Sequence, residues 1–192
     1  MIDNVFKEFL NRIYPLSDRD IEVLQEAFEP GQIDKKGFLL KEGQVTNQLF
    51  FIKSGIYRGY YVKDIDEITV NFYFGPTLYA DIASIFDKVP TKYNMQAWEG
   101  GEVWFGDLRK IEALGQEYPS ILRLFLRFYE VIYTFVQKRQ LSFIFDSAEE
   151  RYLKLFNERP KVIHNMPLAY IASYLGIKPE SLSRIRKKIS HS

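Results

Sequence analysis

The sequence predicts an α+β protein in which a β-rich N-terminal domain is followed by a long helix and a C-terminal helix-turn-helix. Three observations predict this order of parts. Nine of the eleven glycines lie between Gly31 and Gly106, in a segment of short apolar runs. The stretch from Ser120 to Arg159 contains neither glycine nor proline. Residues 161–192 combine two short amphipathic stretches with six lysines and arginines against one acidic residue.

The short apolar runs predict an all-β sandwich, jelly roll or barrel within residues 1–117, and the family resemblance described below implies the double-stranded β-helix, or jelly roll. The runs recur at the spacing of strands in a sandwich or barrel, and turn residues stand at the breaks. A helical spacing over 80–88 predicts one short helix inside this domain, and a further helix is expected near the N-terminus. The expected strands are 28–35, 38–41, 48–54, 56–62, 67–74, 93–99 and 102–106.

The glycine-free stretch predicts a long helix over 118–145 that is apolar nearly all round. Twelve of the sixteen residues from 121 to 136 are apolar or aromatic. Such a helix must be covered on more than one side. One side can pack on the β-domain, and the other is covered either within a single monomer or by the same helix of a second subunit. We expect a dimer whose seam, at 3/4 spacing, is formed by Leu122, Phe125, Tyr129, Ile132 and Val136.

A capping pattern predicts that the long helix breaks near Phe145. Ser147 lies three residues before Glu150, so its hydroxyl can accept from the Glu150 amide while the carboxylate reaches back to the Ser147 amide. A second helix is therefore expected over 148–158. Because acidic residues are favoured in the first turn of a helix, Glu149 and Glu150 are interpreted as helix-start residues and not as catalytic carboxylates.

The remaining part of the C-terminal domain, 146–192, predicts a helix-turn-helix. Pro167 can open a helix, Gly176 can end it, and Pro179 can open another. Two short helices joined by a turn of three or four residues containing glycine are typical of this motif. The second helix would run over 179–189 with its polar side chains outward.

These outward side chains are of the types that bind double-stranded DNA, and a helix of this diameter fits the major groove. Arg184 can donate two hydrogen bonds to guanine, Glu180 can accept one from cytosine, and lysines can neutralise phosphates. The alternative is an ordinary helical hairpin with a solvated basic face. The candidate DNA-binding residues are Lys178, Glu180, Ser181, Ser183, Arg184, Lys187 and Lys188.

Composition excludes several classes of site. The chain has no cysteine, which excludes disulfides, thiolate metal sites and cysteine nucleophiles. Its two histidines, His164 and His191, lie outside the β-segment, so a two-histidine metalloenzyme of the β-helix type has little support. No secretory signal and no apolar run of about 18 residues is present. We therefore expect a cytoplasmic protein with no metal, no catalytic residue and no membrane contact.

Three blocks of the sequence carry a family resemblance. They are KKGFLLKEGQVTNQLFFIKSGIYRGYY (35–61), the aromatic-rich long helix, and LAYIASYLGIKPESLSRIRKKI (168–189). Together they resemble the Crp/Fnr family of transcription regulators, and Glu180, Ser181 and Arg184 fall where that family reads bases. The resemblance implies a cyclic-nucleotide-binding-like β-roll and a homodimer that reads a palindromic site with helix 179–189. It also implies RNA polymerase and an unidentified small-molecule effector as partners.

The sequence departs from the family at the phosphate-binding cassette. Ala80 and Asp81 stand where nucleotide-binding members have Gly-Glu, and Thr91, Lys92 and Tyr93 replace Arg-Ser-Ala. A hydroxyl cannot imitate the bidentate arginine fork, so we expect no cyclic nucleotide. Asp81, Thr91 and Lys92 remain the candidate ligand-binding residues.

Two further expectations concern the C-terminal wing and an alternative function for the β-roll. The family usually adds a β-hairpin wing after the recognition helix, and the sequence stops three residues after Ile189, so we expect no wing. The alternative function is a nucleotide-like binding module whose β-roll ligand controls the dimer. Its pocket would be lined by aromatic residues that otherwise form plain core, namely Phe72, Phe74, Tyr79, Tyr93 and Trp98.

Overall fold

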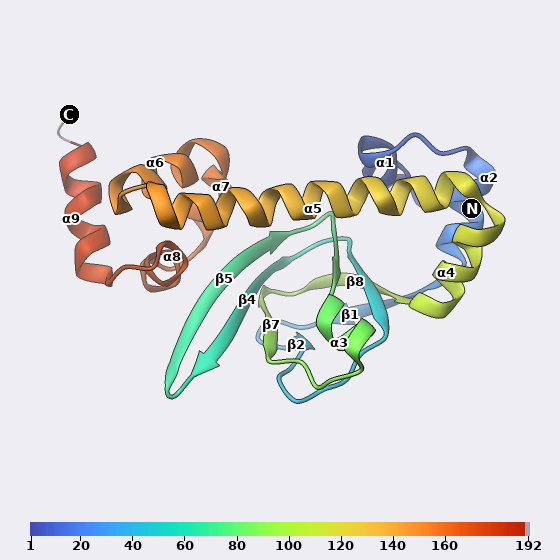
Figure 1. Cartoon of the computed structure of the whole chain (residues 1–192), viewed down its shortest axis with the longest axis horizontal. Helices are drawn as coiled ribbons and strands as arrows, with labels where there is room; N and C mark the ends of the chain where they lie inside the picture. The colour runs from blue at the N-terminus through green and yellow to red at the C-terminus, as the bar shows by residue number, and fades with distance from the viewer. Residues whose placement is uncertain (191–192) are drawn as a thin grey trace. The chain divides into compact units, whose positions relative to one another are not determined.

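The structure, a computed structural model, describes residues 1–190 and confirms the α+β class (Figure 1). Packing divides the chain into two compact units. The first joins Met1–Gly59 to Tyr73–Ile132, and the second joins Tyr60–Phe72 to the chain from Tyr133 onward. Because this division follows packing and not chain order, it does not coincide with the expected boundaries after residues 117 and 145. His191 and the expected lack of a wing concern residues outside the described range.

Two four-stranded sheets form the roll, in the orders β1-β8-β3-β6 and β2-β7-β4-β5. All seven expected strands are present, and an eighth, β6, follows the turn at Gly75-Pro76. The pairs β1–β8, β3–β8, β3–β6 and β2–β7 are antiparallel. The strands are β1 (Phe28–Ile33), β2 (Phe38–Leu40), β3 (Gln48–Ile52), β4 (Ile56–Lys63), β5 (Asp66–Phe74), β6 (Thr77–Ala80), β7 (Tyr93–Glu99) and β8 (Gly101–Asp107).

The helices confirm the long helix and its break at Phe145. They also confirm the short helix expected over 80–88 and the helix expected over 148–158. Three helices of the described residues were not expected: α4, α7 and the second of the two N-terminal helices, α2. The helices are α1 (Asn4–Ile13), α2 (Asp18–Gln25), α3 (Ile82–Asp87), α4 (Leu108–Glu117), α5 (Pro119–Phe145), α6 (Ala148–Glu158), α7 (Pro160–Asn165), α8 (Leu168–Leu175) and α9 (Pro179–Ile189).

An aromatic cluster joins α1 to the β1-β8-β3-β6 sheet. The ring of Phe6 on α1 lies 4.9 Å from that of Phe51 on β3 and 5.3 Å from that of Trp104 on β8. Leu124 and Phe128 on α5 belong to the same buried cluster. Burial of such large side chains is the dominant favourable contribution to folding, so this cluster anchors the start of α5 on the roll.

A half-buried ion network holds the N-terminus of α1 beside this cluster. Lys53 lies 2.9 Å from Asp3 and 3.0 Å from Glu102, and the Trp104 indole donates to Glu102 at 2.7 Å. The Trp104 and Lys53 hydrogen bonds lower the pKa of Glu102. Burial acts to raise the pKa of Asp3, but the hydrogen bonds from Lys53 and the Phe6 amide outweigh it and the pKa is lowered. Both carboxylates are therefore held in their charged form.

A second row of aromatic rings joins the two sheets. Tyr79 on β6 stacks on Tyr93 of β7 with centroids 5.6 Å apart, and lies 6.3 Å from Phe50 of β3. The hydroxyls of Tyr73 and Tyr93 are 3.1 Å apart. A Cβ atom at Gly59 would lie 1.7 Å from the Tyr93 hydroxyl, so the position requires glycine. Aromatic side chains thus occupy the space between the sheets at this level.

Removing the hydroxyl group from two tyrosines of the roll is expected to change the free energy of unfolding in opposite directions. Tyr57 is completely buried, its hydroxyl has no hydrogen-bond partner among the described residues, and burial raises its pKa to about 12. An unpaired buried hydroxyl costs about 1–3 kcal/mol, so Tyr57→Phe is expected to raise the free energy of unfolding by about 1 kcal/mol. Tyr73→Phe removes a bonded hydroxyl and is expected to lower it by a similar amount. Urea unfolding measures both, and a destabilised Tyr57→Phe would contradict the assignment.

Candidate DNA interface

The turn between α8 and α9 has the geometry that the sequence predicts. Gly176 ends α8 with φ +70°, a left-handed conformation that glycine adopts without strain. The Ile177 amide then donates back to the Ala172 carbonyl at 3.0 Å, which closes the end of the helix. Pro179 occupies the first turn of α9, where its missing N–H costs nothing. The two helices pack on each other, and α9 runs at a steep angle to α8 (Figure 1).

Opposite faces of α9 have opposite chemistry. Leu182 is completely buried, and Ile185 and Ile189 on the same face are half-buried. At 3.6 residues per turn, the reverse face is centred on Glu180, Arg184 and Lys187. Ser183 and Lys188 lie at its sides, Ser181 lies toward the apolar face, and Lys178 is the N-cap. All are exposed except Ser181, which is half-buried.

Some of these polar groups are already engaged within the protein. Arg184 Nη2 donates to Ser181 Oγ at 3.3 Å, so the arginine side chain is in contact with a half-buried hydroxyl. The Ser183 hydroxyl donates to the Pro179 carbonyl at 3.1 Å and is turned back on its own helix. Lys188 pairs with Glu149 of α6 at 2.7 Å. Arg184 is therefore the group best placed to exchange a weak internal contact for a base.

The start of α6 has the expected capping box. Ser147 Oγ accepts from the Glu150 amide at 3.2 Å, and the Glu150 carboxylate accepts from the Ser147 amide at 2.7 Å. These hydrogen bonds lower the pKa of Glu150. Both Glu149 and Glu150 stand in the first helical turn, as predicted, and Glu149 has the additional contact with Lys188.

Two arginines that sequence reasoning missed hold the C-terminal end of α8. Arg139 on α5 donates to the Tyr174 carbonyl at 2.8 Å, and its guanidinium lies 3.7 Å from the Tyr174 ring centre. Arg151 on α6 donates to the Leu175 carbonyl at 3.1 Å. Helix C-termini carry unpaired carbonyls and partial negative charge, which cations stabilise. No sequence pattern signals this role, because both arginines read as ordinary helix-surface charges.

Phe143 completes this support. Its ring lies 4.9 Å from the Arg139 guanidinium and 5.0 Å from that of Arg151. A Cβ atom at Gly176 would lie 2.8 Å from the same ring, so the glycine serves both the turn and the close approach of the helices. The position of α8, and of α9 packed on it, thus depends on residues of α5 and α6.

The structure divides the predicted dimer seam on α5. Phe125 and Ile132 are half-buried against the first unit's own aromatic cluster. Leu122, Tyr129 and Val136 are exposed, as a free seam requires. Two apolar residues that the prediction omitted, Leu126 and Tyr133, are exposed beside them. The resulting stripe, with side-chain exposures between 40% and 69%, comprises Leu122, Leu126, Tyr129, Tyr133 and Val136.

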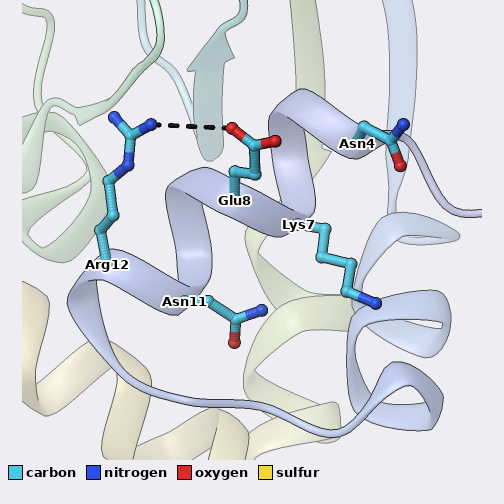
Figure 2. Close-up of a pocket in the computed structure, with 5 residues that line it drawn as sticks. All are labelled: Asn4, Lys7, Glu8, Asn11 and Arg12. Atoms are coloured by element: carbon cyan, nitrogen blue, oxygen red, sulfur yellow. Dashed lines mark ion pairs between the residues drawn. The ribbon is translucent and has the colours of Figure 1, made fainter.

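Other features of the described residues offer no competing site. Residues 1–190 contain no cluster of His, Cys, Asp and Glu able to hold a metal ion. Among the helices described, none has the length and apolarity needed to cross a membrane. A surface hollow of about 580 Å³ lies on α1 (Figure 2), where Asn4, Lys7, Glu8, Asn11 and Arg12 line it and Arg12 pairs with Glu8 at 3.7 Å.

Comparison with known proteins identifies the fold. By sequence, no protein-family model and no curated protein matches the chain. A CooA variant from Carboxydothermus hydrogenoformans is similar in structure over 100% of this chain and 86% of its own, with a TM-score of 0.75 and 18% identity. FixK2 from Bradyrhizobium japonicum is similar over 85% of this chain and 85% of its own, with a TM-score of 0.70 and 14% identity. The regulator CLP from Xanthomonas campestris is similar over 91% of this chain and 92% of its own, with a TM-score of 0.71 and 12% identity.

The chain has the Crp/Fnr fold. Identities this low establish the fold alone, and the fold places each predicted part in order: a cyclic-nucleotide-binding-like roll, the long helix α5 and the C-terminal helices. A cyclic nucleotide-binding domain from Methylobacillus flagellatus is similar over 70% of this chain and 78% of its own, with a TM-score of 0.62 and 14% identity.

The residues of the predicted cassette are hydrogen-bonded among themselves. Asp81 caps the short helix α3 by accepting from the Ser84 amide at 3.2 Å, and it also accepts from the Thr91 hydroxyl. Thr91 in turn accepts from the Tyr93 amide at 2.9 Å and is 4% exposed. Asp81 and Thr91 thus bond to each other and to the backbone of the cassette, and Lys92 is exposed.

The aromatic residues considered for a ligand pocket make separate contacts. Tyr79 and Tyr93 stack on each other between the sheets. Phe72 belongs to the second unit, with its ring 5.4 Å from that of Tyr174 on α8. Trp98 lies under the Lys35 ammonium at 5.7 Å. One pocket lined by all five residues stays a prediction.

Proposed function

We propose that the protein is a homodimeric transcription regulator of the Crp/Fnr family that reads a palindromic DNA site with α9. One observation carries this proposal: α9 buries Leu182 against its own motif while presenting Glu180, Arg184 and Lys187 on an exposed face. A solvated hairpin needs only polarity on that face. A mixed set of an acid, an arginine and lysines supplies both base readout and phosphate neutralisation.

The fold neighbours support a regulatory and non-enzymatic role. Two of them are a catabolite activator protein from Thermus thermophilus and the global regulator CLP. The Thermus protein is similar over 93% of this chain with a TM-score of 0.59 and 15% identity. A promoter-binding regulator in the cytoplasm, with RNA polymerase as a further partner, is the function consistent with these neighbours and with α9.

Substitution of Arg184 tests the DNA-reading role. Arg184→Ala is expected to lower the affinity for the selected DNA site by roughly 5- to 150-fold, since a bidentate base contact is worth about 1–3 kcal/mol. Its preference at one base position should also relax. The site is first selected from random duplexes with the wild-type protein, and affinity is then measured by fluorescence anisotropy. Arg12→Ala, an exposed arginine on α1, is the matched control and should leave the affinity unchanged. An unchanged affinity for Arg184→Ala would refute its role.

The exposed stripe on α5 supports dimerisation. Apolar side chains at 3/4 spacing along a helix are the pattern by which two helices pack together, and a contiguous exposed apolar surface marks an interaction site. The occupant proposed is a second copy of this chain, because a palindromic site requires two α9 helices related by a two-fold axis. Two such helices reach half-sites about 34 Å apart.

Charge on the stripe should separate the dimer. Tyr133→Glu is expected to convert the protein to a monomer at micromolar concentration, because it places a desolvated charge in an apolar seam. Val131→Glu is the matched control, since Val131 is also exposed but lies on the side of α5 away from the stripe. Multi-angle light scattering gives the mass of each variant. Equal dimerisation of both variants would show that the stripe is not the seam.

The roll of this regulator is proposed to bind no cyclic nucleotide, and its effector is some other small molecule. The cassette has Thr91, Lys92 and Tyr93 in place of the arginine segment that binds a phosphate bidentately, and the aromatic row fills the space between the sheets. Cyclic AMP and cyclic di-GMP at millimolar concentration are therefore expected to leave the midpoint of thermal unfolding unchanged. A ligand at 100 times its dissociation constant would stabilise the fold by about 2.7 kcal/mol, so a saturable rise in the midpoint would contradict this proposal.

A further inference from the structure

The outer part of the β4–β5 hairpin packs on the first helix of the helix-turn-helix. Residues Tyr60–Phe72 belong to the same compact unit as α6–α9. The sheet order places β5 at the edge, so one side of its backbone has no partner strand. Side chains of α8 and of the α6–α7 junction occupy that side, and two of them, Ser173 and Arg159, make the polar contacts.

Ser173 on α8 takes the place of a neighbouring strand. Its hydroxyl accepts from the Thr69 amide at 2.9 Å and donates to the Glu67 carbonyl at 3.1 Å. These two backbone groups are two residues apart and point to the same side of β5, as the groups that pair with a partner strand do. Thr69 is 1% exposed, so the hydroxyl of Ser173 bonds a backbone amide that is shielded from water.

Arg159 fastens the next part of the same strand. It stands where α6 ends and α7 begins. Its Nη1 atom donates to Asn71 Oδ1 at 2.9 Å and to the Tyr174 hydroxyl at 3.4 Å, and its Nη2 atom donates to the Phe72 carbonyl. The Phe72 ring packs on that of Tyr174 with centroids 5.4 Å apart. One guanidinium thus joins β5, α8 and the α6–α7 junction.

The hairpin neither covers the DNA-reading face nor extends it. Glu180, Arg184 and Lys187 are exposed although the hairpin is packed on α8. The hairpin tip holds three acidic residues, Asp64, Asp66 and Glu67, against a single lysine, so it would repel the phosphates of DNA. The packing of the hairpin on α8 therefore neither blocks the DNA-reading face nor adds a contact to DNA. The role that remains for this packing is to fix the position of α8.

We infer that Ser173 and Arg159 are positioning residues that fasten α8 to the β4–β5 hairpin and so fix how α9 is presented to DNA. The inference rests on the proposed function, since positioning has meaning only if α9 reads DNA. A recognition helix must enter the groove with its side chains in register, and looser placement of its partner helix lowers affinity without changing which bases are preferred.

Hydrogen exchange and DNA binding, measured on the same full-length variants, test this inference. Ser173→Ala and Arg159→Met are expected to exchange faster at the amides of 66–72 and 168–175. Each should bind the selected DNA about 5- to 10-fold more weakly, with the same preferred sequence and the same salt dependence, because neither residue touches a phosphate. Ser173→Thr keeps the hydroxyl and should restore affinity. Arg123→Met, an exposed arginine on α5, is the matched control and should alter neither readout.

The outcomes separate the inference from the proposed function. Unchanged exchange in Ser173→Ala and Arg159→Met would show that these side chains do not hold the hairpin. Faster exchange with unchanged affinity would overturn positioning, and a reduced salt dependence for Arg159→Met would reassign Arg159 to phosphate contact. A wild-type protein without sequence-specific binding would overturn the proposed function, whereas the exchange rates would still decide whether the two residues fasten the hairpin.

Discussion

The two apolar faces of α5 are the constraint on which the rest of the structure depends. One face, with Ile121, Leu124 and Phe128, is buried in the aromatic cluster of the first unit. The other, the stripe from Leu122 to Val136, is exposed along a helix of 27 residues. A helix with a single apolar face could bury all of that face against the roll. This one carries a second apolar face that the described residues leave exposed, so the proposed dimer and the packing of the roll rest on the same segment.

Arginine has an unusual share in holding the C-terminal unit together. Three arginines, Arg139, Arg151 and Arg159, each donate to backbone carbonyls around α8 or β5. The helices of this unit are short, and short helices bury little apolar area, so polar contacts at helix ends and strand edges make up part of the difference. The planar guanidinium suits this task because it reaches several acceptors at once while its faces pack on the rings of Phe143 and Tyr174.

Turns and helix caps, which depend on the backbone preferences of a few neighbouring residues, could be predicted from the sequence. The packing of one element on another could not. Gly176 and Pro179 mark the turn because their backbone preferences are local, and the same holds for the Ser147–Glu150 capping box. Periodicity reveals two apolar stripes on α5 but not which one faces the roll. The predicted seam therefore includes Phe125, which packs on the cluster of the first unit.

The roll shows the same division. The missing arginine of the cassette is visible in the sequence, but the contact of Asp81 with Thr91 depends on how the strands fold. Strand β6 was missed because four residues after a Gly-Pro turn give too short a pattern to recognise. Phe72 reads as a core residue of the roll, and only the packing of the hairpin reveals that its partner is Tyr174.

The side chain of Ser173 on the edge of β5 has a consequence for solubility. An uncovered strand edge presents a row of unpaired amides and carbonyls that can pair with another chain and start aggregation. Here the amide of Thr69 and the carbonyl of Glu67 are taken by a helix of the same chain, so the edge is closed without a further strand. Apolar side chains on the hairpin, among them Ile65 at 94% exposed, would add apolar contacts to any pairing of an open edge with another chain. The Ser173 hydroxyl therefore occupies two backbone groups of β5 that could otherwise pair with a strand of another molecule.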